Sequence, residues 1–297
     1  MEKVNDYILS PAATVMVAGS SKGAQKKYYE NGYWYKENSS GYEGIAEHLA
    51  TLVLKCSNIE DFAIYERCTI NGKKGCFSKN FLGENETYIS LHRLHDMYVG
   101  GKIDDYVYRY QDVNERIKYV ESFVKDITGL DIHEYFSKLF TFDALILNTD
   151  RHFNNIGIIV DAKNNAYRFA PVFDNGRSML SEIDRFPFNV SIEENIDSVV
   201  GKPFSANLEY QAHLFGYGLE INYDKLYNLL EKEEKNRALD VLYVQLEKYK
   251  ERLNIKEIKR DDRLEVRFEE AKRLAVESKG IARPQRNIES LENDIKL

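Results

Sequence analysis

The chain has few of the residues that mark disulfide-rich, membrane or nucleic-acid-binding proteins. Its 297 residues include only three cysteines, Cys56, Cys68 and Cys76, which lack the paired spacing of a zinc site. We therefore expect free thiols in a reducing compartment, with a Cys68–Cys76 pair across a hairpin as the alternative. No run of eighteen apolar residues is present, which excludes a transmembrane helix. The formal net charge of −7 argues against general nucleic-acid binding.

The sequence also lacks repeats and a secretory signal, and its composition is ordinary. The five prolines are scattered, and no repeat or low-complexity segment is present. The first ten residues lack the apolar core flanked by positive charge that a secretory signal requires. Hydrophobic residues at 43% and charged residues at 30% are typical of a globular protein. We expect a cytoplasmic protein of one large or two closely packed domains, and export without a signal stays open as an alternative.

The N-terminal part of the chain predicts β-strands and one helix. Apolar residues take up helical spacing from Glu43 onward, and Asn71-Gly72 is the signal of a two-residue hairpin. Residues 19–27, rich in small side chains, are expected to form a loop between strands. The patterns predict about five strands and one helix before Gly83, with strands that include residues 13–17, 32–36, 62–69 and 75–77.

Beyond Gly83 the pattern is mostly helical. Helical periodicity is expected over residues 114–128, 132–147, 223–253 and 263–278. Two short strands, 156–160 and 167–169, interrupt it as a hairpin. A linker near residues 78–86 divides the chain into a small, β-rich N-terminal lobe, 1–82, and a larger, mostly helical C-terminal lobe, 83–297. The fold class is therefore α+β.

Two segments predict a phosphoryl-transfer site. Asp150 and Asn155 follow an apolar helix, and Asp174 follows the second strand of the hairpin. Because a hairpin brings its two ends together, we expect Asp174 beside Asn155. Transfer from ATP requires a carboxylate that orients the attacking hydroxyl, and amide and carboxylate oxygens that hold Mg²⁺. Asp150 with Asn155 alone is equally typical of a capped turn, but the spacing to Asp174 favours catalysis.

His152 and Arg151 lie inside the same segment. No second histidine follows four residues after His152 and no cysteine is close, so a zinc site is not predicted. We expect His152 to be buried and to hydrogen-bond the loop backbone. Arg151 is expected to pair with an acidic or phosphorylated group, or to be a solvated surface charge.

Lys36 completes the predicted site. It ends a strand that follows the loop of residues 19–27, where its ammonium group could contact nucleotide phosphates. The loop matches neither the Walker pattern nor a Gly-x-Gly-x-x-Gly pattern, but its small residues would let backbone amides approach phosphate. Glu47 on the next helix is expected to hold Lys36 in an ion pair. Glu43, one turn earlier, is the alternative, and either glutamate could be a plain surface charge.

Taken together, these residues resemble those of HipA-like serine/threonine kinases, the toxin kinases of bacterial toxin–antitoxin systems. The resemblance spans about residues 15–180 and is carried by Gly23, Ala24, Gln25, Lys27, Lys36, Glu47, Thr149, Asp150, His152, Asn155, Ala170, Pro171 and Asp174. It implies a bilobal protein-kinase-like fold with ATP and Mg²⁺ as cofactors. It also implies a compact form without the extra N-terminal domain of full-length toxins.

The resemblance further implies a role for each matched residue. Asp150 would be the catalytic base, Asn155 and Asp174 the Mg²⁺ ligands, and Lys36, paired with Glu47, the phosphate-binding lysine. Residues 78–82 would be the hinge that contacts adenine. Ser20, or its neighbour Ser21, would be the loop serine whose self-phosphorylation switches the enzyme off. The implied nucleotide-binding set is Ser20, Ser21, Gly23, Ala24, Gln25, Lys27, Lys36, Phe77, Ser78, Asn80, Phe81, His152, Asn155 and Asp174.

The expected function is an ATP- and Mg²⁺-dependent protein kinase acting on serine or threonine, with a small antitoxin or a separate N-terminal-domain protein as a further partner. A phosphoinositide (lipid) kinase is one alternative, suggested by Arg151 and by Asp174-Asn175-Gly176, although no basic amphipathic membrane face is evident. The other alternative is a catalytically silent nucleotide-binding module that acts through its charged C-terminal helices.

Overall fold

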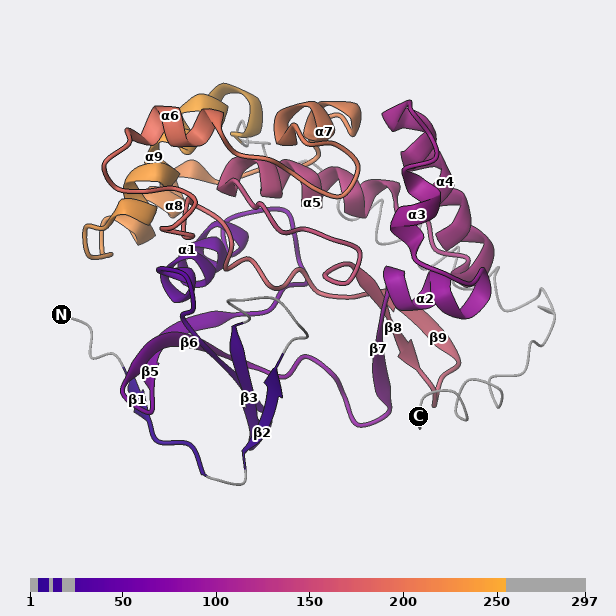
Figure 1. Ribbon diagram of the computed structural model, residues 1–297, viewed down its shortest axis with the longest axis horizontal. Helices are drawn as coiled ribbons and strands as arrows, with labels where there is room; N and C mark the ends of the chain where they lie inside the picture. The colour runs from indigo at the N-terminus through magenta and orange to yellow at the C-terminus, as the bar shows by residue number, and fades with distance from the viewer. Residues whose placement is uncertain (1–4, 11–12, 18–24, 255–297) are drawn as a thin grey trace, which may run out of the picture.

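The computed structural model describes residues 5–10, 13–17 and 25–254. Within these ranges the chain forms a β-rich N-terminal lobe below a larger, mostly helical lobe (Figure 1). Ser20, Ser21, Gly23 and Ala24, and the helix expected over residues 263–278, lie outside the described residues. No described helix combines the length and the apolar character that crossing a bilayer requires.

The described residues of the N-terminal lobe form one six-stranded sheet and one helix. The strand order is β1-β5-β6-β4-β3-β2, and only the β1–β5 pair is parallel. Helix α1 (Glu43–Leu54) packs on β5 and β6 and lies between the sheet and helices α8 (Tyr223–Leu230) and α9 (Arg237–Leu253) (Figure 1). The strands are β1 (Asn5–Tyr7), β2 (Thr14–Val17), β3 (Lys26–Glu30), β4 (Tyr33–Glu37), β5 (Tyr65–Ile70) and β6 (Lys73–Lys79).

Two Asn-Gly turns set the register of this sheet. Asn31 and Gly32 join β3 to β4, and Asn71 and Gly72 join β5 to β6; all four have positive φ, between 50° and 81°. Asn and Gly adopt this left-handed backbone readily, and its twist matches that of the flanking strands. The hairpin predicted at Asn71-Gly72 is therefore confirmed. The β3–β4 register also places Lys27 directly opposite Lys36.

The strand prediction was incomplete, and β7 (Glu86–Ser90) was not predicted. Nor were β1 and β3 in the N-terminal sheet, and Lys26 and Lys27, expected in a loop, begin β3. Both strands are short and carry polar residues, so neither shows the apolar alternation by which strands are recognised. The alternative of a Cys68–Cys76 pair is wrong. Cys68 lies opposite Gly75 in the ladder, so the two thiols occupy opposite faces of the sheet, and all three cysteines are free and buried.

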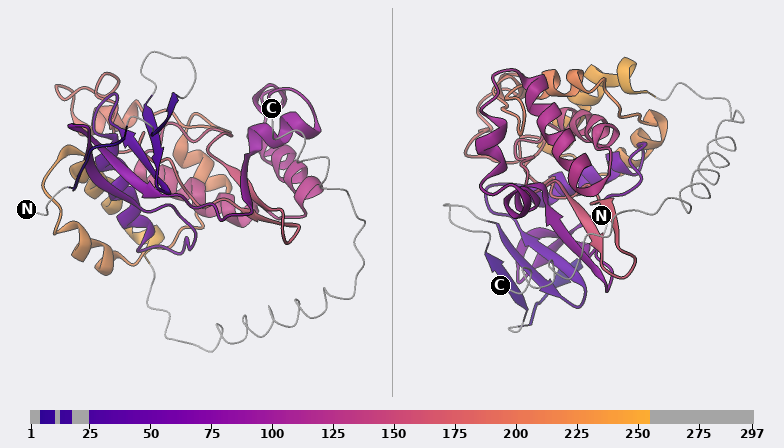
Figure 2. Two further views of the ribbon diagram at one scale, coloured as in Figure 1. Left: turned by 90° about the horizontal axis from the view of Figure 1, so that it is seen from below. Right: turned by 90° about the vertical axis from the view of Figure 1, so that its right-hand side faces the viewer.

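The C-terminal lobe surrounds helix α5 (His133–Ile146), which packs on α7 and α9 and buries Phe136, Phe140 and Phe142 completely. Figure 1 shows the β7-β8-β9 sheet below helices α3 and α4, and Figure 2 shows the molecule from two further sides. The predicted hairpin is confirmed as β8 and β9, and the helix expected over 223–253 is divided because Asn236 caps a new helix there. The remaining elements are β7 (Glu86–Ser90), α2 (Leu91–Tyr98), α3 (Ile103–Val107), α4 (Val113–Thr128), β8 (Gly157–Asp161), β9 (Ala166–Phe169), α6 (Ile192–Asp197), α7 (Leu208–Leu214), α8 (Tyr223–Leu230) and α9 (Arg237–Leu253).

Candidate active site

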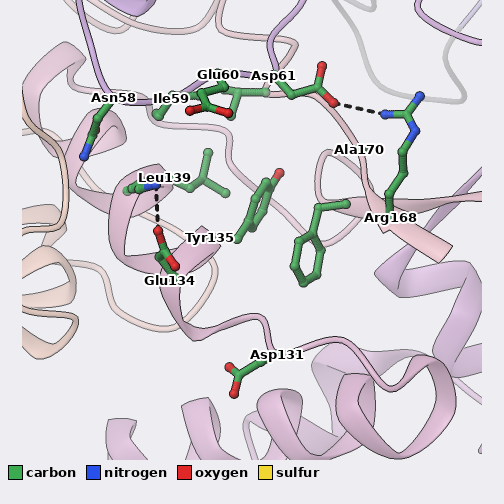
Figure 3. Close-up of a pocket in the computed structure, with 13 residues that line it drawn as sticks. Asn58, Ile59, Glu60, Asp61, Asp131, Glu134, Tyr135, Leu139, Arg168 and Ala170 are labelled. Carbon is green, nitrogen blue, oxygen red and sulfur yellow. Dashed lines mark hydrogen bonds and ion pairs between the residues drawn. The ribbon is translucent and has the colours of Figure 1, made fainter. Parts of the chain in front are cut away.

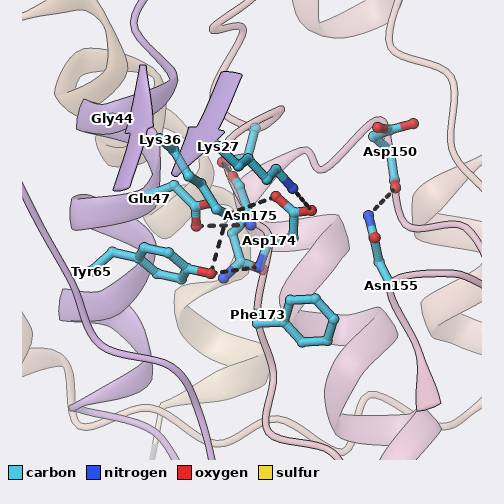
Figure 4. Close-up of polar contacts among 12 residues, drawn as sticks. Lys27, Lys36, Gly44, Glu47, Tyr65, Asp150, Asn155, Phe173, Asp174 and Asn175 are labelled. Carbon is cyan, nitrogen blue, oxygen red and sulfur yellow. Dashed lines mark hydrogen bonds and ion pairs between the residues drawn. The ribbon is translucent and has the colours of Figure 1, made fainter. Parts of the chain in front are cut away.

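A buried ion-pair cluster joins the two lobes at Lys36. Lys36 Nζ lies 2.7 Å from Glu47 Oε1 and 2.8 Å from Asp174 Oδ1, and its side chain is only 5% exposed (Figure 4). Tyr65 contributes a hydroxyl 3.2 Å from the same nitrogen and a ring whose centre is 4.4 Å away. Burial acts to lower the pKa of Lys36, but Asp174 and Glu47 raise it well above its usual value. The ammonium group is therefore charged although it is buried.

Helix α1 supplies Glu47 to this cluster and uses Glu43 elsewhere. The second carboxylate oxygen of Glu47 accepts a hydrogen bond from the Asn175 backbone N–H at 2.9 Å, so Glu47 contacts both Lys36 and the segment after Phe173. Glu43 accepts hydrogen bonds from Ser39 and Ser40, the shortest 2.7 Å from the Ser40 N–H. Of the two glutamates considered for the ion pair with Lys36, the structure pairs Glu47.

Asp174 is held by two lysines. Lys27 Nζ lies 2.9 Å from Asp174 Oδ2, while Lys36 contacts Oδ1, so each carboxylate oxygen carries one ammonium partner (Figure 4). Burial acts to raise the pKa of the Asp174 carboxyl, but Lys36 and Lys27 together hold it well below its usual range. Asp174 has a φ of 58°, a left-handed backbone that a residue without Gly's freedom adopts only where its surroundings enforce it.

Asp150 and Asn155 form a second group of contacts. Asn155 Nδ2 donates to the Asp150 backbone oxygen at 3.2 Å, and in Figure 4 the Asp150 carboxylate points away from Asn155. Among the described residues no hydrogen bond or ion pair joins Asn155 to Asp174, which belong to separate groups of contacts in that view. The amide oxygen of Asn155 is the atom that remains for a cation.

Lys202 and Arg177 flank the Asp150 carboxylate and were not predicted. Lys202 Nζ lies 2.9 Å from Asp150 Oδ1, and an Arg177 guanidinium nitrogen lies 3.7 Å from Oδ2. Arg177 follows the Asp174 turn by three residues, a nearness that could have drawn attention to it. No sequence motif identifies Lys202, which comes from a loop fifty-two residues away.

Arg151 is neither a surface charge nor available to a phosphate group. It is completely buried, and its guanidinium contacts both oxygens of Asp143, at 2.9 and 3.0 Å. It also donates to the Phe173 backbone oxygen at 2.7 Å and to Asn175 Oδ1 at 2.6 Å. Of the roles considered for it, pairing with an acidic group is the one found. Arg151 thereby connects the Asp150 segment to the Asp174 segment.

The expectation of a buried, backbone-bound His152 is wrong. Its side chain is 36% exposed, and its Nε2 lies 3.9 Å from Asp150 Oδ2. Its buried Nδ1 has no hydrogen-bond partner among the described residues. Partial burial lowers the pKa of His152, with Asp150 opposing the shift. The loop backbone bonds within itself instead, His152 N–H to Asp150 O and Asn155 N–H to His152 O.

The expected nucleotide-contacting residues near the hinge fall into two sets. Phe77 packs against Tyr7 and Tyr35, on the face of the sheet opposite Lys36, so it does not face the site; strand alternation puts it there. Ser78 is buried on the Lys36 side, and Phe81 packs on Phe173 with ring centres 5.4 Å apart.

Two further members of the expected set have distinct surroundings. Asn80 Oδ1 accepts a weak hydrogen bond from the Trp34 indole N–H at 3.4 Å. The side-chain nitrogen of Gln25, next to the loop, is buried and has no hydrogen-bond partner among the described residues. Such a donor can serve a phosphate oxygen.

A pocket of about 500 Å³ lies elsewhere on the surface, between the segment before β5, helix α5 and strand β9 (Figure 3). Neither Lys36 nor Asp150, Asn155 or Asp174 lines it. Two pairs of its charged groups form ion pairs, Asp61 with Arg168 at 3.0 Å and Glu134 with Lys138 at 2.8 Å. This pocket is therefore separate from the candidate site.

Comparison with known proteins identifies the fold. No protein-family model and no curated protein matches the chain. A crystal structure of the proinflammatory kinase CtkA from Helicobacter pylori matches at a TM-score of 0.59 and 13% identity, covering 84% of this chain and 95% of that one. HipA from Shewanella oneidensis MR-1, in complex with HipB and its operator DNA, matches at a TM-score of 0.33 and 12% identity. That match covers 80% of this chain and 60% of the HipA chain. The chain has the α+β fold of the CtkA kinase, which confirms the kinase-like fold that the sequence resemblance implies.

Proposed function

We propose that this chain is an ATP- and Mg²⁺-dependent kinase that transfers the γ-phosphoryl group to a serine or threonine hydroxyl of a protein. One observation carries the proposal: the buried ammonium group of Lys36 lies between the carboxylates of Glu47 and Asp174. Kinases hold nucleotide phosphates with a lysine that a helix glutamate orients, beside a carboxylate that binds metal. The fold shared with CtkA supports the same assignment by analogy.

The residues present fit Mg²⁺ bound together with a nucleotide. Asp174 and Asn155 offer a carboxylate and an amide oxygen, and Mg²⁺ commonly takes one or two protein ligands and completes its shell with phosphates and water. The site holds two ammonium groups and two carboxylates, those of Lys27, Lys36, Glu47 and Asp174, so its formal charge is zero. A divalent cation that bound without nucleotide would therefore be repelled by two ammonium groups with no excess negative charge to offset them. We therefore expect metal and nucleotide to bind together, with Lys27 leaving Asp174 for a phosphate oxygen.

In the proposed reaction, Mg²⁺ would neutralise the charge that develops on the phosphate oxygens. Asp150 accepts the proton of the acceptor hydroxyl. The hydroxyl oxygen bonds to the γ-phosphorus while the bond from that phosphorus to the β,γ-bridging oxygen breaks, and ADP leaves. The Asp150 side chain is 22% exposed, so an acceptor side chain can reach it.

A transfer assay tests the proposal. Purified protein is incubated with ATP labelled on the γ-phosphate, Mg²⁺ and a cell lysate, and the labelled residues are mapped. Asp150→Ala should lower incorporation by about 10²- to 10⁴-fold, the usual contribution of a general base. Asp96→Ala, at an exposed aspartate paired with Arg93, is the matched control and should leave incorporation unchanged. Label that persists undiminished in Asp150→Ala would sink the assignment.

The same assay separates the alternatives. A silent nucleotide-binding module would bind ATP and yield no label. A lipid acceptor was suggested in part by Arg151, which is buried against Asp143 and cannot reach a headgroup, so we propose a protein acceptor. Self-phosphorylation at Ser20 and an antitoxin partner stay predictions of the resemblance.

A further inference from the structure

Lys202 contacts the carboxylate that the proposed function places at the chemical step. Its Nζ lies 2.9 Å from Asp150 Oδ1, within hydrogen-bonding distance. The other oxygen, Oδ2, has His152 Nε2 at 3.9 Å and an Arg177 nitrogen at 3.7 Å, both too far for a hydrogen bond. One oxygen of Asp150 is therefore occupied by Lys202, and no described residue hydrogen-bonds the other, which can receive an incoming hydroxyl.

The loop that carries Lys202 is fixed by hydrogen bonds on both sides of this residue. Gln211, which is completely buried, donates to the Lys202 carbonyl at 3.1 Å and accepts from the Phe204 N–H at 3.0 Å. Tyr108 donates to the Pro203 carbonyl at 2.6 Å, and Arg116 donates to the Phe204 carbonyl at 2.8 Å. Three consecutive carbonyls of the loop thus have side-chain donors, and none of these contacts involves the Lys202 side chain.

Packing fixes this loop against the Asp150 segment. Phe204 is completely buried, and its ring lies 5.6 Å from that of Phe153, three residues after Asp150. Phe204 also packs edge to face on Phe136 and Phe140 of helix α5, which leads into the same segment. Lys202 and Asp150 are therefore held at one distance by a shared aromatic core, although they lie far apart in the sequence.

We propose that Lys202 is a positioning residue for phosphoryl transfer: it fixes the Asp150 carboxylate so that Oδ2 receives the acceptor hydroxyl. This inference rests on the proposed kinase function. In the step, the hydroxyl proton passes to Oδ2, the hydroxyl oxygen bonds to the γ-phosphorus, and ADP leaves, while the Lys202 ammonium group stays on Oδ1. Lys202 takes no part in binding ATP.

The test compares Lys202→Met and Lys202→Arg with the wild-type protein. Transfer from labelled ATP to dephosphorylated casein, or to the protein itself, gives kcat and the KM for ATP; calorimetry gives the ATP affinity. Lys202→Met should lower kcat by about 10- to 100-fold, the cost of a misplaced reacting group. The KM and the ATP affinity should stay within about twofold, and Tm within a few degrees, because backbone contacts hold the loop. Lys202→Arg should recover part of kcat, since a guanidinium can also pair with Oδ1.

Controls separate this inference from the proposed function. Lys118→Met removes a lysine with a comparable 2.8 Å ion pair to Glu115 far from the site, and it should leave kcat unchanged. The double variant Asp150→Asn/Lys202→Met should be no slower than Asp150→Asn, because Lys202 acts through Asp150. A wild-type kcat in Lys202→Met, or a loss shared with ATP affinity and Tm, would overturn the positioning role. Undiminished transfer in Asp150→Asn would instead overturn the kinase assignment.

Discussion

At the scale of single residues, buried Arg151 holds two segments of the candidate site in place. Its guanidinium and the Asp143 carboxylate are both completely buried. Burial raises the pKa of Asp143, and Arg151 opposes that rise, so the carboxylate depends on the guanidinium to remain charged. Because Arg151 also binds the Phe173 carbonyl and Asn175, it fixes the Asp150 and Asp174 segments relative to each other.

Removal of Arg151 should therefore destabilise the whole protein. We expect Arg151→Met to lower the free energy of unfolding by about 3–5 kcal/mol, because Asp143 would be left as an uncompensated buried charge. Arg93→Met, at an exposed arginine paired with Asp96, should cost less than about 1 kcal/mol. Urea denaturation of the two variants and the wild type measures both values. A loss of stability in Arg151→Met no larger than that in Arg93→Met would contradict this role.

At the scale of elements, the start of helix α1 depends on Glu43. One oxygen of its carboxylate accepts hydrogen bonds from the backbone N–H and the hydroxyl of both Ser39 and Ser40, at 2.7–3.2 Å. Burial acts to raise the pKa of Glu43, but these hydrogen bonds hold it below its usual value of 4.5. Since α1 also carries Glu47, an ordered helix start keeps Glu47 beside Lys36.

This capping makes a prediction about pH. A depressed pKa in the folded state means that the carboxylate stabilises the protein above pH 4.5 and that this contribution is lost as the pH falls through the folded-state value. Glu43→Gln should be less stable than the wild type by about 1.5–3 kcal/mol at pH 7, and the difference should shrink steadily below pH 4.5. Glu115→Gln, at an exposed glutamate on α4, is the control. Thermal unfolding between pH 3 and 7 gives the comparison, roughly spanning the range over which carboxylates titrate. A difference that does not change with pH would contradict the explanation.

At the scale of the whole molecule, local sequence patterns predicted many of the helices and strands. Elements whose place depends on contacts with distant parts of the chain could not be predicted in this way. Asn71-Gly72 predicted its hairpin because only a few residues tolerate that backbone, and the apolar spacing before Asp150 predicted helix α5. The polar strand β3 was missed, because its place in the sheet comes from pairing with β2 and β4 rather than from its own pattern.

In the candidate site, too, contacts between neighbouring elements could be predicted, whereas contacts between residues far apart in the sequence could not. The Lys36–Glu47 ion pair could be predicted because both residues belong to consecutive elements. The approach of Lys27 to Asp174 and of Lys202 to Asp150 could not be predicted, since those pairs are 147 and 52 residues apart and no motif links them. The burial of Arg151 was also hidden, because an arginine is usually exposed and its partner Asp143 lies within an apolar helix.

We infer that the Asp174 group of contacts is a metal–nucleotide site, and calorimetric titration of ATP with and without Mg²⁺ tests this claim. The wild type should bind ATP more tightly when Mg²⁺ is present. Asp174→Asn should lose that dependence, and its affinity for ATP with Mg²⁺ should fall by about tenfold or more, which is about 1.4 kcal/mol. Asp61→Asn, at an aspartate paired with Arg168 outside the site, should bind as the wild type does. If Asp174→Asn binds ATP with the wild-type affinity and the wild-type dependence on Mg²⁺, the claim is contradicted.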